Sequence, residues 1–248
     1  MEKSQRNIKL TIAYDGTNYH GFQRQTNAVT IQQILEEKLG KLFGHQIKVA
    51  GAGRTDAGVH AYGQVVNFYT TGSIPVEKIP LAARGIMPPD IVVLKAELAE
   101  PRFHARISAK GKTYIYRLYY DKLSNPFHRY YAWHVYHPID VEAMHQAAQI
   151  VVGTHDFSAF RAAGGVAKNP VRTILEASCL SKNGIVEFSF TGTGFLYHMV
   201  RNLVGTLVNV GAGKICAQRF AEILASCDRH QAGATAPPQG LYLKDVYY

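Results

Sequence analysis

The sequence predicts an α+β fold in which two similar α/β halves form a largely antiparallel central sheet flanked by helices. Three observations lead to this class. Alternating apolar segments, typical of strands, are interspersed with helical patterns in both halves of the chain. Short turn sequences such as Lys182-Asn183-Gly184 separate neighbouring strands, as in hairpins. The chain has 248 residues, 47% hydrophobic and 18% charged, which is enough for a substantial core.

The first half opens with a predicted strand at 7–14, which the turn Asp15-Gly16 ends. A helix follows, because a capping-box pattern begins at Thr30 and apolar residues then recur at helical spacing up to Gly44. The other elements expected in this half are strands at 46–50 and 64–70, a short helix over 73–84 and a strand at 91–98.

The second half opens with 107–121, expected to be a strand or a hairpin. Asp140 is predicted to cap a helix that runs through Val152, with Gly153 as its terminator. The other elements expected are strands at 172–180 and 184–192, helices at 194–211 and 217–226 and a closing strand at 241–248. No sequence repeat is visible between the halves, and we place them at 1–105 and 106–248.

Charge and cysteine content narrow the function classes. Lys and Arg total 27 against 18 Asp and Glu, a net charge of +9 that favours a polyanionic partner such as a nucleic acid. No apolar run is long enough for a membrane helix, and the first residues lack a signal-peptide core. Three cysteines without Cys-x-x-Cys spacing favour a reducing cytoplasm, and no metal-binding motif is present. We therefore expect a cytoplasmic protein without a membrane partner.

The glycine-rich stretch GAGRTDAGVHA, residues 51–61, is the first candidate site. It matches neither nucleotide-binding fingerprint, and a carboxylate at its centre would repel phosphate. Arg54 lies two residues before Asp56 and could pair with it or contact a phosphate. Taken alone, the loop is equally consistent with a charged turn and with a catalytic carboxylate.

Aromatic and basic residues alternate in KTYIYRLYY, residues 112–120. Strand periodicity places Tyr114, Tyr116, Leu118 and Tyr120 on one face. Such a face can stack nucleobases, or it can simply pack under a helix.

Two further segments carry arginines that could contact a carboxylate or a phosphate. In FLYHMVRNLVG, residues 195–205, a core-facing helical stripe leaves Arg201 beside the core and four residues after Tyr197, where it could meet a carboxylate or a phosphate. Arg161 and Arg172 lie in and just after HDFSAFRAAGG and are candidates for phosphate contacts. The same residues are also explained without a functional site. Arg201 would then be an arginine on a helix surface, and the phenylalanines of HDFSAFRAAGG would pack in the core.

Together these segments, in this order, resemble the tRNA pseudouridine synthase A (TruA) family. GRTDAGVHA and HMVRN are the most specific blocks, and the similarity runs from YDGTNYHGFQRQ near residue 14 to the terminal GLYLKDVYY. The resemblance implies a cofactor-free and metal-free isomerase that converts uridine to pseudouridine at positions 38, 39 and 40 in the anticodon stem-loop of tRNA. It also implies a homodimer of protomers with two ferredoxin/RRM-like α/β halves, acting on tRNA and not on DNA.

The resemblance also implies roles for four residues. Asp56 matches the catalytic aspartate, and Tyr114 matches the tyrosine that stacks on the target uracil. Arg201 matches the arginine that pairs with the aspartate, and Arg54 is expected to help hold the flipped-out nucleotide.

The chain departs from the family pattern at three positions outside this set: Phe22 replaces a tryptophan, Arg84 an asparagine and Gly165 a cysteine. The replacement at Arg84 puts in question the local contact of that asparagine and, with it, the choice of substrate position.

Two other classes fit less well. A glycoside hydrolase needs a second carboxylate near Asp56, for which Asp15 and Asp90 are candidates by residue type only. A non-catalytic RNA-binding module could use the tyrosine strand, but its RNP signature is absent and Asp56 would be unexplained.

Overall fold

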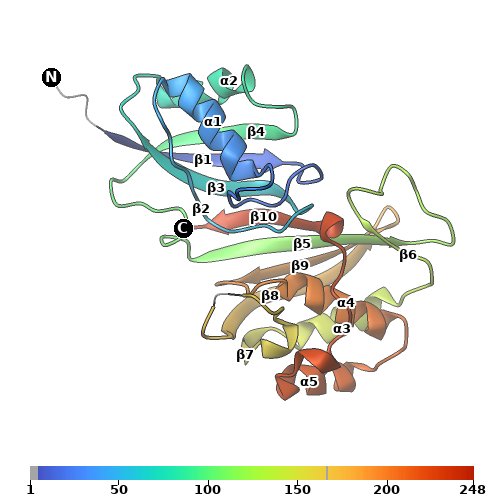
Figure 1. The fold of residues 1–248 in the computed structure, drawn as a ribbon. Coiled ribbons are helices and arrows are strands. Elements are labelled where there is room, and N and C mark those ends of the chain that lie inside the picture. Colours follow the sequence, from blue (N-terminus) through green and yellow to red (C-terminus); the bar gives the residue numbers. More distant parts are fainter. Residues whose placement is uncertain (1–4, 166) are drawn as a thin grey trace. The chain divides into compact units, whose positions relative to one another are not determined.

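The structure is a computed structural model, and it describes residues 5–165 and 167–248. The chain divides into two compact units: Met1–Lys110 with Leu243–Tyr248, hereafter the first unit, and Gly111–Tyr242, the second unit. Each unit combines a mostly antiparallel sheet with helices (Figure 1), so the predicted α+β class is confirmed. No helix in the described part of the chain is long and apolar enough to cross a membrane.

The sheet of the first unit has the strand order β4-β1-β3-β10, and the short strand β2 pairs with β3. The pairs β1–β3, β1–β4 and β2–β3 are antiparallel. The strands are β1 Arg6–Tyr14, β2 Ala50–Gly51, β3 His60–Thr70, β4 Ile91–Ala99 and β10 Leu241–Tyr247, which belongs to this unit from Leu243 onward. The helices are α1 Ile31–Phe43, the 3₁₀ turn η1 Val76–Lys78 and α2 Ile79–Arg84.

Helix α1 forms as its capping signals predict. The Thr30 side chain accepts a hydrogen bond from the Gln33 N–H, and Gly44 ends the helix in the left-handed conformation at φ 71°. Ile31, Leu35 and Leu39 form its buried face.

The strand predicted at 46–50 is wrong except at Ala50. The reason lies at Val49, whose backbone groups bind side chains of α1 instead of a neighbouring strand: Val49 N–H donates to Glu36 at 3.1 Å, and Gln32 donates to the Val49 carbonyl at 3.1 Å. The helix expected over 73–84 is shorter than predicted and is divided into η1 and α2.

The second unit has the strand order β5-β9-β8-β7, and β6 pairs in parallel with β5. Helix α3 packs against β8 and α4, and α5 contacts both α3 and α4. The strands are β5 Gly111–Tyr120, β6 Trp133–Val135, β7 Gly153–Asp156, β8 Val171–Lys182 and β9 Ile185–Gly192. The helices are α3 Val141–Gln149, α4 Met199–Gly211 and α5 Ala217–Ser226, with 3₁₀ turns η2 Ser158–Phe160, η3 Arg229–Gln231 and η4 Pro238–Gly240.

The β8–β9 hairpin is confirmed, since Asn183 and Gly184 both have positive φ, 53° and 78°, as an Asn-Gly turn requires. Helix α3 ends at Gln149, three residues earlier than predicted, and Gly153 begins β7. Helix α4 begins at Met199 and not at 194, because His198 has the left-handed φ of 58° and cannot continue a helix.

Candidate active site

The loop between β2 and β3, residues 52–59, carries Arg54 and Asp56. Because β2 and β3 pair with each other, the chain leaves the sheet at Gly51 and returns to it at His60. Arg54 is exposed, Thr55 is buried and Asp56 is partly buried. The loop therefore presents a partly buried carboxylate and, two residues before it, an exposed arginine.

The loop backbone is bonded at most of its positions. Ala52 N–H donates to the Val65 carbonyl at 2.8 Å, and Gly58 N–H donates to the Tyr19 carbonyl at 3.3 Å. Val59 N–H donates to the Asp56 carbonyl at 3.1 Å, which closes a turn directly after the aspartate. Gly58 has a φ of 75°, which accounts for the last glycine of the motif. The glycine-rich sequence thus forms a defined turn around Asp56.

The segment after β1, residues 15–22, packs closely on this loop. Phe22 N–H donates to the Thr55 carbonyl at 3.0 Å. A Cβ added at Gly16 would lie 2.0 Å from the Val59 carbonyl oxygen, and one added at Gly21 would lie 2.6 Å from that of Thr55. Sequence reasoning missed this role, since the Asp15-Gly16 pair signals only a turn. Any side chain at these two glycines would push the aspartate loop away.

Asp15 and Asp90, the carboxylates considered for a hydrolase, make hydrogen bonds within or to the segment of residues 15–22. Asp15 accepts hydrogen bonds from Thr17, at 2.9 Å from its N–H and 2.6 Å from its hydroxyl, and lies 3.1 Å from His60 Nδ1. Tyr19 donates its hydroxyl to Asp90 at 2.6 Å, and burial together with this carboxylate raises the pKa of Tyr19. Both carboxylates thus have structural partners, which weakens the hydrolase alternative.

In the second unit, Tyr114 lies on β5 opposite Phe190 of β9 and is 8% exposed. Its ring meets that of Phe195 edge to face, with 4.9 Å between centroids. Tyr116 is fully buried and donates its hydroxyl to the Pro237 carbonyl at 2.8 Å, while burial raises its pKa and the charge of Arg201 opposes the rise. Tyr116 therefore belongs to the core, whereas Tyr120 at the strand end is exposed.

Arg201 lies in the first turn of α4 and is partly buried. Its Nε donates to the Ala236 carbonyl at 2.8 Å, and its own carbonyl accepts from the Ala236 N–H at 3.1 Å. The 232–236 segment therefore holds Arg201 by backbone and side chain. The predicted helical spacing from Tyr197 is wrong, because Tyr197 precedes the helix and is 44% exposed.

Arg161 and Arg172 gather positive charge in the second unit. Arg161 donates to the Gly165 carbonyl at 2.6 Å, and Arg172 donates to the Asn169 and Val171 carbonyls at 2.9 and 2.6 Å. Burial, followed by the nearby charge of Arg161, lowers the pKa of Arg172. Two adjacent cations held by neutral carbonyls can contact an RNA phosphate.

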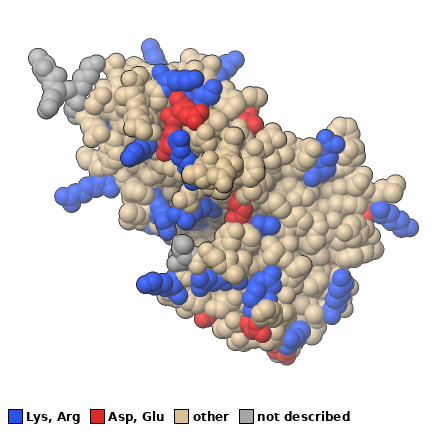
Figure 2. All heavy atoms as spheres, in the orientation of Figure 1, with Lys and Arg blue, Asp and Glu red and all other residues tan. Residues whose placement is uncertain are grey.

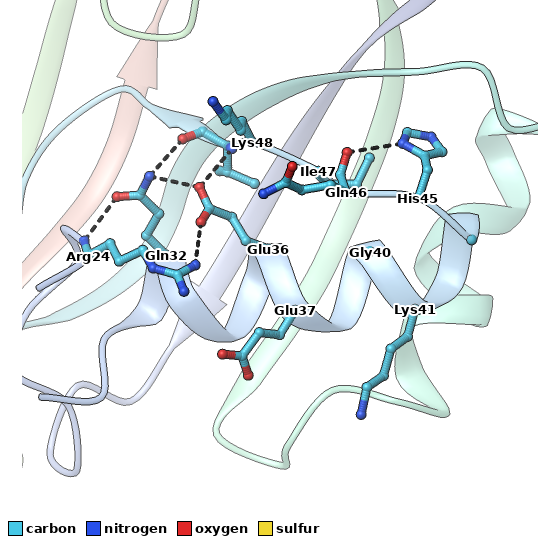
Figure 3. Close-up of a pocket in the computed structure, with 12 residues that line it drawn as sticks. Arg24, Gln32, Glu36, Glu37, Gly40, Lys41, His45, Gln46, Ile47 and Lys48 are labelled. Atoms are coloured by element: carbon cyan, nitrogen blue, oxygen red, sulfur yellow. Dashed lines mark hydrogen bonds and ion pairs between the residues drawn. The ribbon is translucent and has the colours of Figure 1, made fainter. Parts of the chain in front are cut away.

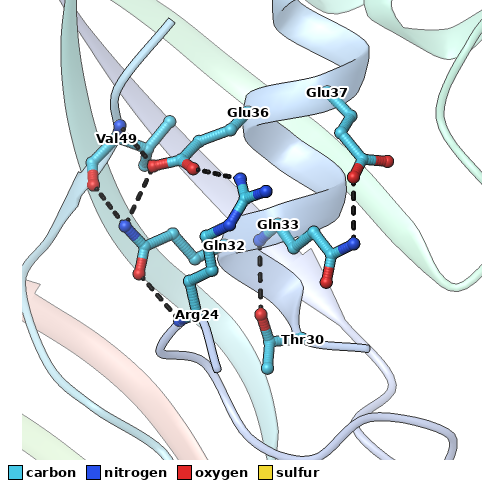
Figure 4. A network of polar contacts seen from close by, with 7 residues as sticks. All are labelled: Arg24, Thr30, Gln32, Gln33, Glu36, Glu37 and Val49. Atoms are coloured by element: carbon cyan, nitrogen blue, oxygen red, sulfur yellow. Dashed lines mark hydrogen bonds and ion pairs between the residues drawn. The ribbon is translucent and has the colours of Figure 1, made fainter. Parts of the chain in front are cut away.

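A hollow of about 940 Å³ runs between α1 and residues 44–49 (Figure 3), away from the predicted site residues. Its carboxylate Glu36 already accepts hydrogen bonds from Arg24 at 2.9 Å, Gln32 at 3.0 Å and Val49 N–H at 3.1 Å (Figure 4). The bonds from Glu36 and Gln32 fix Val49, at the end of this segment, to the helix. Because Glu36 is already bonded within the protein, we assign the residues around the hollow a structural role in the first unit.

The structure thus places Arg54 and Asp56 in one loop of the first unit, and Tyr114 and Arg201 on neighbouring parts of the second unit. Sequence reasoning did not identify Tyr14, whose hydroxyl is 2.8 Å from the Thr55 hydroxyl oxygen, or Gln64, which binds Gly53. The available signal was a glutamine at the start of QVVNF, where Asn67 is the only other polar residue.

Comparisons with known proteins agree with one another. A family model described as tRNA pseudouridine synthase matches residues 10–107 and 147–248. Proteins named tRNA pseudouridine synthase A from Acetivibrio thermocellus and Lacticaseibacillus casei are both 48% identical to this chain, over 98% and 97% of it and 100% and 98% of their own lengths. One from Thermoanaerobacter sp. is 46% identical over 98% of this chain and all of its own.

A solved structure of an H/ACA ribonucleoprotein with a substrate RNA that contains 2′-deoxyuridine is far more distant. It has a TM-score of 0.36 and 12% identity, and the match covers 82% of this chain and 53% of that chain. That likeness is too weak to support a functional inference.

Proposed function

Because the chain belongs to the tRNA pseudouridine synthase family, whose members are isomerases acting on uridine in tRNA, we propose that it modifies positions 38, 39 and 40 of the anticodon stem-loop with Asp56 as its catalytic residue. The observation that supports Asp56 most strongly is its setting. Asp56 lies in a loop whose backbone is held by hydrogen bonds before and after it. Arg54, two residues earlier in the same loop, is exposed.

The reaction exchanges one bond of C1′ for another. The C1′–N1 bond breaks, the uracil turns, the C1′–C5 bond forms, and the proton on C5 leaves while N1 gains one. Asp56 can attack C1′ to give a covalent intermediate, or it can remove the C2′ proton to give a glycal. Both routes require an ionised carboxylate, so a guanidinium close to it in the substrate complex favours catalysis.

The other three residues are proposed to bind substrate. Tyr114 supplies a ring on which the uracil stacks while it turns, and its hydroxyl is a candidate base for the C5 proton. Arg201 is proposed to keep the carboxylate ionised, and Arg54 to hold the flipped-out nucleotide. Flipping a base out of a stem costs a few kcal/mol, which stacking and phosphate contacts offset.

Charge supports tRNA as the partner. The chain carries a net charge of +9, and Lys and Arg cover more of the face drawn in Figure 2 than Asp and Glu do. Such a surface attracts the phosphate backbone irrespective of sequence. Acting on tRNA fits a cytoplasmic location, and a homodimer without a metal or a cofactor remains our proposal for the working enzyme.

The test is the release of tritium from tRNA that carries uridine tritiated at C5, since C5 loses its hydrogen when it joins C1′. Asp56→Asn is expected to abolish release and to leave tRNA affinity nearly unchanged, because the amide keeps the size of the side chain and removes only its charge. The matched control is Asp90→Asn, whose amide oxygen can still accept from Tyr19, at 2.6 Å in the present structure. Release near the normal rate from Asp56→Asn would refute the assignment.

A further inference from the structure

Gln64 is a fully buried amide in a strand whose other residues are mostly buried. It lies on β3 next to Val65 and Val66, which are also buried, and its own exposure is 0%. Burying an amide is unfavourable unless both of its polar atoms find partners. Both atoms of Gln64 bind a single residue of the aspartate loop: Gly53 N–H donates to Oε1 at 3.3 Å, and Nε2 donates to the Gly53 carbonyl at 2.8 Å.

Tyr14 makes a second buried link to the same loop. Its hydroxyl and that of Thr55 are 2.8 Å apart, and Tyr14 is also hydrogen-bonded to Gln64. Burial raises the pKa of Tyr14 to about 12, so the phenol stays neutral at working pH. Tyr14 ends β1 and pairs with Ala61 of β3, so both polar residues come from adjacent strands of one rigid sheet.

These links fix the loop on either side of Arg54. Gly53 is held by Gln64, and Thr55 is held through its side chain by Tyr14 and through its carbonyl by the Phe22 N–H. Asp56 follows Thr55 directly. The sheet therefore sets the position of the peptide units that carry both charged side chains of the loop.

We propose that Tyr14 and Gln64 are positioning residues for Asp56, a role that rests on the function proposed above for this carboxylate. A reacting group misplaced by about 1 Å can lose on the order of a hundredfold in rate. The affinity for tRNA should depend mainly on phosphate contacts spread over the basic surface, which a small shift of this one loop leaves unchanged. Loss of either residue should therefore lower the rate of the chemical step and leave tRNA binding almost intact.

The experiment compares two variants with a matched control in the tritium-release assay under single-turnover conditions, with tRNA affinity measured separately. Tyr14→Phe removes one hydroxyl, and Gln64→Met removes the amide at similar length. Tyr19→Phe is the control, because its hydroxyl binds Asp90 and not the loop, while its backbone bond to Gly58 is retained. We expect at least a roughly tenfold slower step for the first two, less than about threefold for the control, and affinity within about twofold for all.

A double-mutant cycle separates positioning from general destabilisation. Once Tyr14→Phe has broken the link to Thr55, Thr55→Val should slow the step little further, so the two effects should not add. Rates are measured at a temperature where near-ultraviolet circular dichroism shows each variant folded.

Tyr14→Phe and Gln64→Met enzymes with normal rates, beside an inactive Asp56→Asn enzyme, would overturn the positioning role alone. An active Asp56→Asn enzyme would instead refute the proposed function. A loss in Tyr19→Phe equal to that in Tyr14→Phe would also overturn the inference, because the effect would then not depend on a side-chain bond to the loop.

Discussion

Replacing Gly205 by alanine should destabilise the protein, although alanine normally stabilises a helix. Gly205 lies inside α4, where an added Cβ would be 1.8 Å from the Ala234 carbonyl oxygen. Carbon and oxygen atoms separate to roughly 3.4 Å at normal contact, so the 232–236 segment would have to move by about 1.6 Å. The obstacle is backbone, which cannot rotate away as a flexible side chain can.

The size of the effect follows from the bonds that this movement would break. The backbone of the segment is held to α4 by two bonds between Arg201 and Ala236, at 3.1 and 2.8 Å, and by Gly233 N–H donating to the Thr206 hydroxyl at 2.9 Å. At about 1 kcal/mol each, their loss costs roughly 3 kcal/mol. Alanine stabilises a helix by about 1 kcal/mol relative to glycine, so the free energy of unfolding should fall by about 2 kcal/mol in total.

Urea denaturation followed by circular dichroism measures this loss, and the corresponding fall in Tm is roughly 4–8 °C. Gly211→Ala is the matched control in the same helix. Its Cβ would meet Met144 side-chain atoms at 2.8 Å, which can rotate away, and the nearest backbone atom, the Asp140 carbonyl oxygen, is 3.2 Å away. We expect the control to stay within about 1 kcal/mol of the wild type. A Gly205→Ala protein as stable as the wild type would show that the contact with Ala234 is not tight and would refute the reasoning.

Two further predictions concern thiols and salt. Cys216 and Cys227 are exposed and should react with a thiol reagent in the folded protein, Cys227 more slowly because partial desolvation and the Asp156 carboxylate raise its pKa. Cys179 is buried, which raises its pKa to about 12, and should react only on unfolding. Three equally fast thiols would contradict this. Arg172→Gln should weaken tRNA binding and reduce the slope of log Kd against log salt concentration by about one unit. The control Arg219→Gln removes a cation already paired with Glu222 at 3.0 Å and should change that slope little. Equal slopes for the wild type and Arg172→Gln would exclude that phosphate contact.

Local sequence signals were sufficient wherever the physical cause was itself local. The Thr30 cap, the Gly44 terminator and the Asn183-Gly184 turn each depend on a few consecutive residues, and each is where the sequence predicts it. The class of the fold followed from these signals and from the strand periodicity.

Predictions from local sequence were wrong where contacts or conformations outside the local pattern decide the secondary structure. Val49 satisfies its backbone through Gln32 and Glu36, more than ten positions earlier, so its apolar pattern did not produce a strand. Helix α4 starts late because of the conformation of a single residue, His198, which no propensity scale anticipates.

The candidate site shows the same division. Asp56 stands out in its motif, but the residues that fix its loop do not. Tyr14 lies 41 positions before Thr55, and Gln64 lies 11 positions after Gly53. Only the pairing of β1 with β3 brings them together, and that pairing is a property of the folded sheet.

The central claim is tested most directly by mapping pseudouridine in an unmodified tRNA transcript after incubation with the protein. New pseudouridine at positions 38, 39 or 40 with the wild-type enzyme, and none with Asp56→Asn, is the result we predict. Pseudouridine formed only outside the anticodon stem-loop, or formed equally well by Asp56→Asn, would contradict it.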